Sequence, residues 1–196
     1  MSRDRQQEKA RRSRERLLEE AGILFSKKKI SDVGVREIAS EAGCTTGTFY
    51  HYFAGKDDII HHLYKEHDAE MGKLLHQWAQ ESGVYCDKIQ TFFAQNLSAT
   101  VLTDGREFTC HRVFQMRRHS GEENQLYVGM QELIQKAIEA GELRTGVSAK
   151  EISAYLFVVF RGVLYEWCLC PPEQVFSLAD RLERLIGYAL QSFRNE

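Results

Sequence analysis

Apolar residues recur along most of this chain at spacings of three and four residues, which is typical of amphipathic helices. The first such set predicts a helix that begins near Lys9 and buries one face, formed by Leu17, Leu18, Ala21, Leu24 and Phe25. The stretch KKKISDVG, at residues 27–34, interrupts this pattern. A second set with the same periodicity predicts a short helix from Val35, Ile38, Ala39 and Ala42.

A third short helix is expected at Thr46–Tyr52, directly after a glycine turn. Gly43 permits the left-handed backbone conformation that commonly ends a helix. The side chain of Thr45 can cap the helix that follows. A longer helix is then predicted from Lys56 onwards, after a break at Gly55.

Beyond residue 80 the apolar periodicity stays helical, and no alternation long enough for a convincing strand occurs. The segment SAKE, at residues 148–151, has the spacing of a capping box. The expected helices are residues 89–97, the stretch REFTCHRVFQMRRH, and residues 126–138, 152–167 and 175–193. The sequence therefore predicts an all-α fold of about nine helices.

The two short helices and the turn between them have the pattern of a helix-turn-helix, which places its second helix in the major groove of DNA. Phe49 and Phe53, four residues apart, would anchor that helix to the core. The opposite face carries groups that can meet phosphates and base edges, on Thr45, Thr46, Thr48, Tyr50 and His51. Gly47 lets the backbone approach the duplex, and Lys56 combines its charge with a helix N-terminus to meet a phosphate.

The stretch RLLEEAGILFSKKKISDVGVREIASEAGCTTGTFYHYFAGKDDII resembles the DNA-binding domain of the tetracycline-repressor (TetR) family. The likeness covers roughly residues 11–71 and depends on the patterns V-R-E-I-A-x-E-A-G, T-G-T-F-Y-x-Y-F and K-D. It implies a three-helix DNA-binding domain at residues 11–71, with its helix-turn-helix at about 34–53, and an effector-binding and dimerisation domain at residues 72–196. By position, it implies DNA contacts from Arg36, Thr45, Thr46, Gly47, Thr48, Tyr50, His51 and Lys56.

The resemblance also implies the partners of the chain. They are a palindromic double-stranded operator, a second copy of the chain in a homodimer, and a small-molecule effector. The expected function is that of a transcriptional regulator, most simply a repressor, which the effector releases from DNA. The release would follow from a shift between conformations, with the effector binding the released state more tightly.

The distribution of charge supports a nucleic-acid partner, although the net charge is only −2. Residues 1–56 contain 12 Lys and Arg against 8 Asp and Glu, whereas the remainder contains 14 against 20. A basic module joined to an acidic one is typical of a nucleic-acid-binding domain beside another domain. The segment RDRQQEKARRSRER either follows the DNA backbone or is a solvated helix end whose charges pair with one another.

Cysteine and histidine residues leave open an alternative, a metal- or redox-responsive regulator of the same fold. Cys168 and Cys170 lie two residues apart, and Cys110 precedes a histidine. Three histidines share one predicted helix with Asp58, namely His61, His62 and His67. Core packing of the thiols, including Cys44, and a solvated histidine face account for the same residues. Neither group completes a ligand set, so no metal site and no cofactor are predicted.

Other functional classes lack support in the sequence. No nucleophile elbow, phosphate loop or zinc-protease motif occurs, so the chain is not expected to be an enzyme. No apolar run approaches the roughly 20 residues of a membrane span, so no membrane partner is expected. The expected location is the cytoplasm, where the five cysteines would stay reduced.

Aromatic residues of the C-terminal domain are candidates for an effector pocket, because helical bundles hold ligands between helices. The candidates are Phe92, Phe93, Phe114, Tyr127, Tyr155, Phe160 and Trp167, with polar contacts from Arg112, Arg117, Arg161 or Glu166. Ordinary core packing would explain the same aromatic residues. Because ring faces attract flat, apolar or cationic molecules, the expected effector is apolar, aromatic or cationic.

The last two predicted helices each carry a broad apolar stripe, part of which a lone domain would expose. In TetR-like proteins such a pair meets its two-fold mate as a four-helix bundle. Charges at Leu182 and Ile186 are therefore expected to give monomers or insoluble protein and to abolish operator binding.

Overall fold

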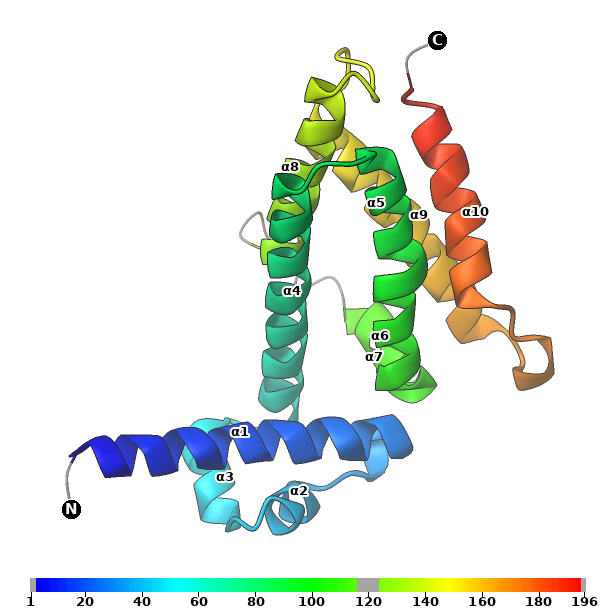
Figure 1. Cartoon of the computed structure of the whole chain (residues 1–196). Coiled ribbons are helices and arrows are strands. Elements are labelled where there is room, and N and C mark those ends of the chain that lie inside the picture. The colour runs from blue at the N-terminus through cyan, green and yellow to red at the C-terminus, as the bar shows by residue number, and fades with distance from the viewer. Residues whose placement is uncertain (1–2, 116–123, 195–196) are drawn as a thin grey trace. The chain divides into compact units, whose positions relative to one another are not determined.

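The computed structural model describes residues 3–115 and 124–194, and the regular elements in these ranges are all helices (Figure 1). The predicted all-α fold is confirmed. The chain forms two compact units, one of residues 1–67 with Asp104–Phe108 and one of residues 68–103 with 109–196. Helix α4 (Lys56–Gln80) contributes to both units.

The first unit is a small helical domain with one apolar core. It contains α1 (Arg3–Lys27), the 3-10 turn η1 (Ile30–Asp32), α2 (Val35–Glu41), α3 (Thr46–Tyr52) and the first part of α4. The apolar residues predicted for α1 are all buried in this core, together with Phe49 and Phe53. Phe108 completes the core by stacking on Phe25, with 5.8 Å between the ring centroids.

Helix α1 extends further towards the N-terminus than its apolar pattern predicts. It includes Arg3, whereas the expected start was near Lys9. Ion pairs one helical turn apart join Glu8 to Arg11 and Arg12, and Arg11 to Glu15. Pairs at these spacings stabilise a helix slightly, so the extension rests on charge rather than on burial.

The second unit is a bundle built mainly on α8 (Gln125–Glu139), α9 (Ala149–Leu169) and α10 (Leu178–Gln191). Helix α9 packs against both α8 and α10. Before them, α5 (Tyr85–Thr91), the π-helical segment η2 (Phe92–Leu97) and α6 (Ser98–Asp104) form one unbroken helix, followed by α7 (Arg106–Gln115). Counted with that unbroken helix as one, the described residues contain nine α-helices, as predicted.

Side-chain caps define several helix ends of the second unit. The predicted capping box is confirmed, because Ser148 and Glu151 bond to each other's backbone N–H groups. Helix α10 begins at Leu178 rather than near residue 175, because the 3-10 turn η4 (Pro172–Gln174) takes up the intervening chain and Ser177 then caps the helix.

A glycine pair lets α4 and α8 cross closely within the second unit. A Cβ atom at Gly72 would lie 2.5 Å from the carbonyl oxygen of Gln125, and one at Gly129 would lie 2.8 Å from that of Gly72. Beside the crossing, Asn124 donates to the carboxylate of Asp68 at 2.7 Å and also caps α8. The crossing therefore requires residues without side chains at two positions.

Among the helices that the structure describes, α9 is the one long and apolar enough to suit a membrane span. Its buried face, which includes Phe157, Phe160 and Trp167, lies in the core of the second unit. Core helices of helical bundles have the same composition, so the apolar character of α9 is weak evidence for a membrane.

Two residues chosen from the sequence to test the dimer prove to be core residues. Leu182 and Ile186 are both 0% exposed within a single chain. A charge at either position would be buried in the domain's own core, so it would unfold the bundle before it could separate two copies. Of the two outcomes expected from sequence, insoluble protein is therefore the one that the structure supports.

Candidate nucleic-acid interface

The turn between α2 and α3 depends on a glycine and on α1. Gly43 has a φ of +62°, and the N–H of Cys44 bonds to the carbonyl of Ala39 at 2.8 Å. A Cβ atom at Gly43 would lie 2.8 Å from Nη2 of Arg16. The guanidinium of Arg16 therefore covers the turn, and no larger residue fits beneath it without a shift.

Helix α3 has one buried edge and one exposed polar face. Phe49 and Phe53 are 0% and 1% exposed and contact each other with ring centroids 5.6 Å apart. The exposed face carries Thr45, Thr46, Gly47, Tyr50 and His51, with Thr48 half-buried at its edge. Tyr50 is the most prominent of these residues, because its side chain is 60% exposed although it is aromatic.

Two threonines of this face also build the helix cap. The hydroxyl of Thr45 accepts the backbone N–H of Thr48 at 3.1 Å and lies 3.0 Å from the hydroxyl of Thr48. The predicted capping role of Thr45 is confirmed. Thr46 makes no such bond to any described residue, so its hydroxyl and its methyl group are both available to a partner.

An open groove of about 540 Å³ lies between α1 and α3. Its walls are Gln6, Lys9, Ala10, Ser13, Thr45, Gly47, Thr48, His51 and Tyr52. Lys9 brings a positive charge to the α1 side, and His51 brings an imidazole to the α3 side. The groove thus joins the basic helix extension to the predicted DNA-facing residues.

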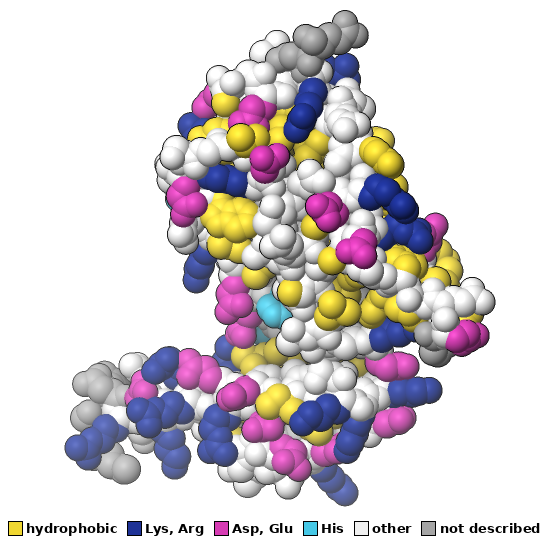
Figure 2. Space-filling model, turned by 45° about the vertical axis from the view of Figure 1, so that its right-hand side comes forward, with side chains coloured by type: hydrophobic (Ala, Val, Ile, Leu, Met, Phe, Trp, Pro, Cys, Tyr) yellow, Lys and Arg dark blue, Asp and Glu magenta, His cyan; other side chains and the backbone are white. Residues whose placement is uncertain are grey.

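The basic segment of α1 is partly neutralised by its own acids. Arg11 and Arg12 both bond to Glu8, and the Arg12 and Arg11 guanidinium groups lower the pKa of Glu8. Figure 2 shows dark-blue basic and magenta acidic side chains intermingled in this part of the chain. Of the two interpretations from the sequence, mutual pairing holds for these arginines, whereas Lys9 lies on the groove.

Lys56 has internal partners that the sequence did not suggest. Its ammonium group donates to the carbonyl oxygens of Ile30 and, at 3.2 Å, Val33. These bonds tie the start of α4 to the η1 turn and use two of the three N–H donors. Arg36, the other cation among the predicted contacts, is exposed on α2.

A charged cluster that no local pattern in the sequence indicated joins α1 to α4. The Arg14 guanidinium donates to Nδ1 of His62 at 3.1 Å, and Nε2 of His62 lies 3.7 Å from Asp58. Asp58 also accepts the N–H of Ala54 at 2.8 Å. Burial and the neighbouring Arg14 charge lower the pKa of His62. The signal in the sequence was the helical spacing of Arg14 with Leu17, Leu18 and Ala21, which places Arg14 beside the apolar face of α1.

The cysteines and histidines considered for metal binding do not form a ligand set among the described residues. Among the described residues, no group of three or more Cys, His, Asp or Glu side chains could hold a metal ion. His67 faces Asp104 at 3.7 Å, rather than the pair of His62 and Asp58. Burial raises the pKa of Cys86 to about 11, so this thiol stays protonated.

The predicted pocket residues occupy three environments. Four of them, at most 5% exposed, belong to the core of the second unit: Phe92, Phe93, Phe160 and Trp167. Tyr127 is half-buried, and Tyr155 is 48% exposed and packs edge-on against Phe193. The side chain of Phe114 and the whole of Arg117 lie outside the described residues.

A line of exposed apolar residues follows α9. Tyr155, Val158, Tyr165 and Leu169 are 48–59% exposed, at spacings of three, seven and four residues. Gly162, exposed as well, lies between them at the same periodicity. Glu166 next to this line pairs with Arg181 of α10 at 3.3 Å. We call Tyr155, Val158, Gly162, Tyr165 and Leu169 the α9 stripe.

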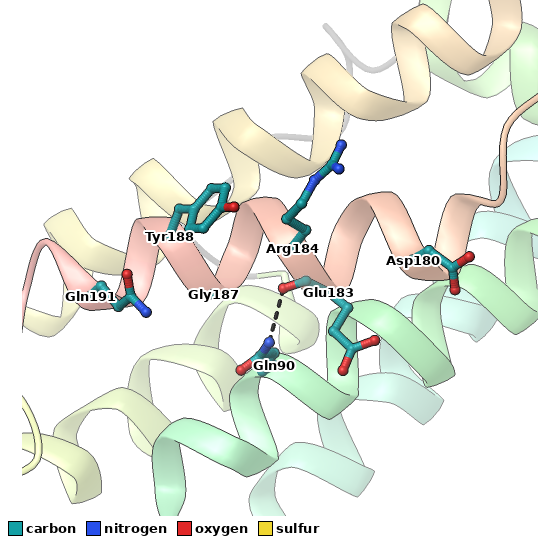
Figure 3. A pocket seen from close by; sticks show the side chains of 7 residues that line it. All are labelled: Gln90, Asp180, Glu183, Arg184, Gly187, Tyr188 and Gln191. Atoms are coloured by element: carbon teal, nitrogen blue, oxygen red, sulfur yellow. Dashed lines mark hydrogen bonds between the residues drawn. The ribbon is translucent and has the colours of Figure 1, made fainter.

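The neighbouring surface of α10 is more polar. Figure 3 shows Tyr188 and Arg184 projecting from one side of α10, and Gln90 reaching across from α5 to donate to the carbonyl of Glu183 at 2.9 Å. Gly187 makes room for this bond, because a Cβ atom there would lie 3.0 Å from Nε2 of Gln90. The result is a shallow groove of about 360 Å³ along α10.

Comparisons with known proteins agree on one family. Residues 17–63 match the family described as "Bacterial regulatory proteins, tetR family". The HTH-type transcriptional regulator AcrR of Shigella flexneri is 23% identical over 98% of this chain and 94% of its own length. A TetR-family transcriptional regulator from Pectobacterium atrosepticum has the same fold, with a TM-score of 0.77, 16% identity and coverage of 100% of this chain and 99% of its own. SmeT, the repressor of a multidrug efflux pump of Stenotrophomonas maltophilia, has a TM-score of 0.73, 16% identity and coverage of 93% and 91%.

Proposed function

Because the chain belongs to the TetR family of transcriptional regulators, we propose that it binds a palindromic operator as a homodimer, represses transcription there and is released by a small-molecule effector. Members of this family are typically ligand-responsive repressors rather than enzymes. One observation carries the DNA-binding part of the proposal. Helix α3 has an exposed polar face, and its other side is anchored by the buried residues Phe49 and Phe53.

Gly47 supports contact between this face and DNA. A Cβ atom there would meet only the Thr45 hydroxyl, at 3.6 Å, which is an ordinary contact distance. Nothing in the first unit therefore requires a glycine in the first turn of α3, where glycine costs up to about 1 kcal/mol relative to alanine. Close approach of an external backbone to α3 supplies a reason for the glycine.

The residues of the interface take different roles. Thr46 and Thr48 present methyl and hydroxyl groups for base edges, whereas Tyr50 and His51 reach phosphates. Arg36 supplies a charge from α2. Lys56 acts mainly from inside the domain by fixing the η1 turn, with one N–H donor left for a phosphate.

The α9 stripe supports the homodimer. Four large apolar side chains on one face of α9 are costly to leave in water, and a two-fold partner would cover them with the same stripe. The central Gly162 has no heavy atom within 4 Å of its Cβ position, so it leaves space for a second helix. The stripe replaces Leu182 and Ile186 as the proposed contact.

Equilibrium binding tests the proposal directly. Fluorescence anisotropy would compare the DNA upstream of the gene with a scrambled duplex of the same length and composition, at two salt concentrations. The expected result is a strong preference for the upstream duplex, with two chains per operator by sedimentation. Equal affinity for both duplexes across salt concentrations would refute operator recognition.

A further inference from the structure

Two cations of α1 differ from the arginines beside them, because no acidic side chain engages them. Among the described residues, neither a hydrogen bond nor an ion pair holds the side chain of Lys9 or of Arg16. By contrast, Arg11 and Arg12 pair with Glu8 at 3.0 and 2.8 Å. Lys9 and Arg16 are both exposed, so they keep their charge and their N–H donors for a group outside the described chain.

The two cations lie on one face of α1, nearly two helical turns apart. At a rise of about 1.5 Å per residue, about 10 Å of helix separates Lys9 from Arg16. Lys9 lines the groove between α1 and α3, together with Gln6 and Ser13. The guanidinium of Arg16 lies over Gly43, in the turn that leads into α3. The two charges therefore follow α1 from the wall of the groove to the start of α3.

The groove itself is suited to a chain of phosphates. No carboxylate is among the residues that line its volume of about 540 Å³. Gln6 on the α1 side and His51 on the α3 side can donate hydrogen bonds to phosphate oxygens. Ala10 and Gly47 add little or no side chain to the two walls, so the groove stays open. An open groove with donors and a cation but no acid is complementary in charge to the DNA backbone.

We propose that one strand of the operator's sugar-phosphate backbone lies in the groove between α1 and α3, where Lys9 and Arg16 bind its phosphates. Helix α1 is then a second DNA-binding element, which holds the backbone while the exposed face of α3 meets base edges. Contacts to phosphates carry no sequence information, so these two residues position the protein without selecting its operator. This assignment rests on the proposed function, because it adds phosphate ligands to the operator contact.

Salt titrations of DNA binding test the two cations. Lys9→Gln and Arg16→Gln should each reduce the slope of log affinity against log salt by about one, and the double variant should reduce it by about two. At about 0.1 M salt, each single variant should bind roughly five- to tenfold more weakly. The loss should be the same for the upstream duplex and for the scrambled duplex. Fluorescence anisotropy over about 50–200 mM salt measures these quantities.

Arg12→Gln is the matched control for the loss of charge. It removes one positive charge from an exposed position of the same helix, but this charge is already paired with Glu8. The variant should keep the wild-type slope and affinity for both duplexes. Arg16→Lys keeps the charge and should restore the slope, which separates a phosphate ligand from a residue that only covers the turn. Urea unfolding establishes that each variant is folded.

A larger side chain tests whether the backbone occupies the groove. Ala10→Leu places a good helix former at this position and fills part of the groove without changing any charge. It should weaken binding to both duplexes by ~5-fold or more. Gln7→Leu adds the same side chain at an exposed position of α1 that does not line the groove, and it should bind like the wild type.

Three results would overturn the assignment: salt slopes of Lys9→Gln and Arg16→Gln that equal that of Arg12→Gln, a slope that Arg16→Lys does not restore, or wild-type affinity of Ala10→Leu. The preference of the wild type for the upstream duplex is measured in the same titrations. If that preference is present, the failure belongs to the groove alone and the proposed function stands. If the wild type shows no preference, the proposed function itself fails.

Discussion

The two units use the same residue types for opposite purposes. In the first unit, Gly47 and Tyr50 lie on an exposed helix face with few neighbours. Contacts within the chain therefore do not explain these two residues, and a partner outside the chain is needed to explain them. In the second unit, Gly72 and Tyr127 are enclosed by other elements, so packing and hydrogen bonding within the chain explain them. A polar, exposed helix face indicates the class of its partner, whereas the aromatic residues of a packed core are explained by contacts within the chain.

The largest contrast is expected between the buried and exposed faces of the last two helices. Leu182→Asp places a charge at a fully buried position and should cost roughly 4 kcal/mol or more, which leaves little folded protein. Val158→Asp changes a residue that is 58% exposed on the α9 stripe and should give folded monomers. Circular dichroism with urea and sedimentation would distinguish them, and folded monomers from Leu182→Asp would contradict the assignment of the core.

A matched pair of glycine substitutions comes next in size. Gly72→Ala would force a Cβ atom to within 2.5 Å of the Gln125 carbonyl and should destabilise the protein by about 1–3 kcal/mol. Gly47→Ala meets no clash and should instead stabilise by up to about 1 kcal/mol while weakening operator binding. Urea unfolding and anisotropy measure both, with Gly146→Ala as a control in open space. Unchanged operator affinity for Gly47→Ala would remove the argument for close DNA approach.

Lys56 and Lys9 should separate a structural cation from a DNA-binding one. Lys56→Ala removes two bonds to the η1 turn and should cost about 1–2 kcal/mol of stability. Lys9→Ala should leave stability unchanged and reduce the slope of log affinity against log salt by roughly one. If Lys56→Ala keeps the wild-type stability and reduces the salt slope, Lys56 contacts a phosphate, as expected from the sequence, and its bonds to the η1 turn contribute little.

The smallest effect is a dependence on pH in the first unit. The pKa of His62 is lowered in the fold, so the unfolded chain binds its proton more readily. The stability that neutral His62 contributes is therefore complete above its ordinary pKa of about 6.5 and is lost as the pH falls towards the lowered value. The groups that face this ring are Arg14, Asp58, His61 and Glu66.

His62→Gln tests this linkage. The melting temperature of the wild type should fall between pH 7.5 and pH 5.5 by more than that of the variant. His76→Gln, which alters an exposed histidine paired with Glu132 in the second unit, is the matched control. Parallel pH profiles for wild type and His62→Gln would show that the ring carries no such stability.

Much of the first unit followed from the sequence, because its helices carry complete local signals. The apolar spacing of α1 and α2, the Gly43 turn and the Thr45 cap each depend on neighbours within a few residues. The internal bonds of Lys56, the cover of Arg16 over Gly43 and the Arg14–His62 contact depend on residues far apart in the chain, so no local pattern could show them.

In the second unit the sequence predicted the helices but not which face of each helix is buried. Phe160 and Tyr155 both lie in the apolar stripe predicted for residues 152–167, yet Phe160 is 1% exposed and Tyr155 is 48% exposed. When an apolar stripe is broader than one contact surface, part of it faces the core and part of it faces outward. Periodicity alone cannot tell these two parts from each other. The hydrogen bond from Arg161 to the Tyr127 hydroxyl was likewise hidden, since the two residues lie on different helices.

Two tyrosines of equal exposure provide the most direct test of the central claim, that α3 binds DNA while the last helices hold the dimer. Tyr50 and Tyr188 are each 60% exposed. Operator binding by anisotropy should weaken at least tenfold for Tyr50→Ala, with the dimer intact by sedimentation. Tyr188→Ala removes an equally exposed tyrosine from α10 and should bind the operator like the wild type. Wild-type operator affinity for Tyr50→Ala would contradict the account.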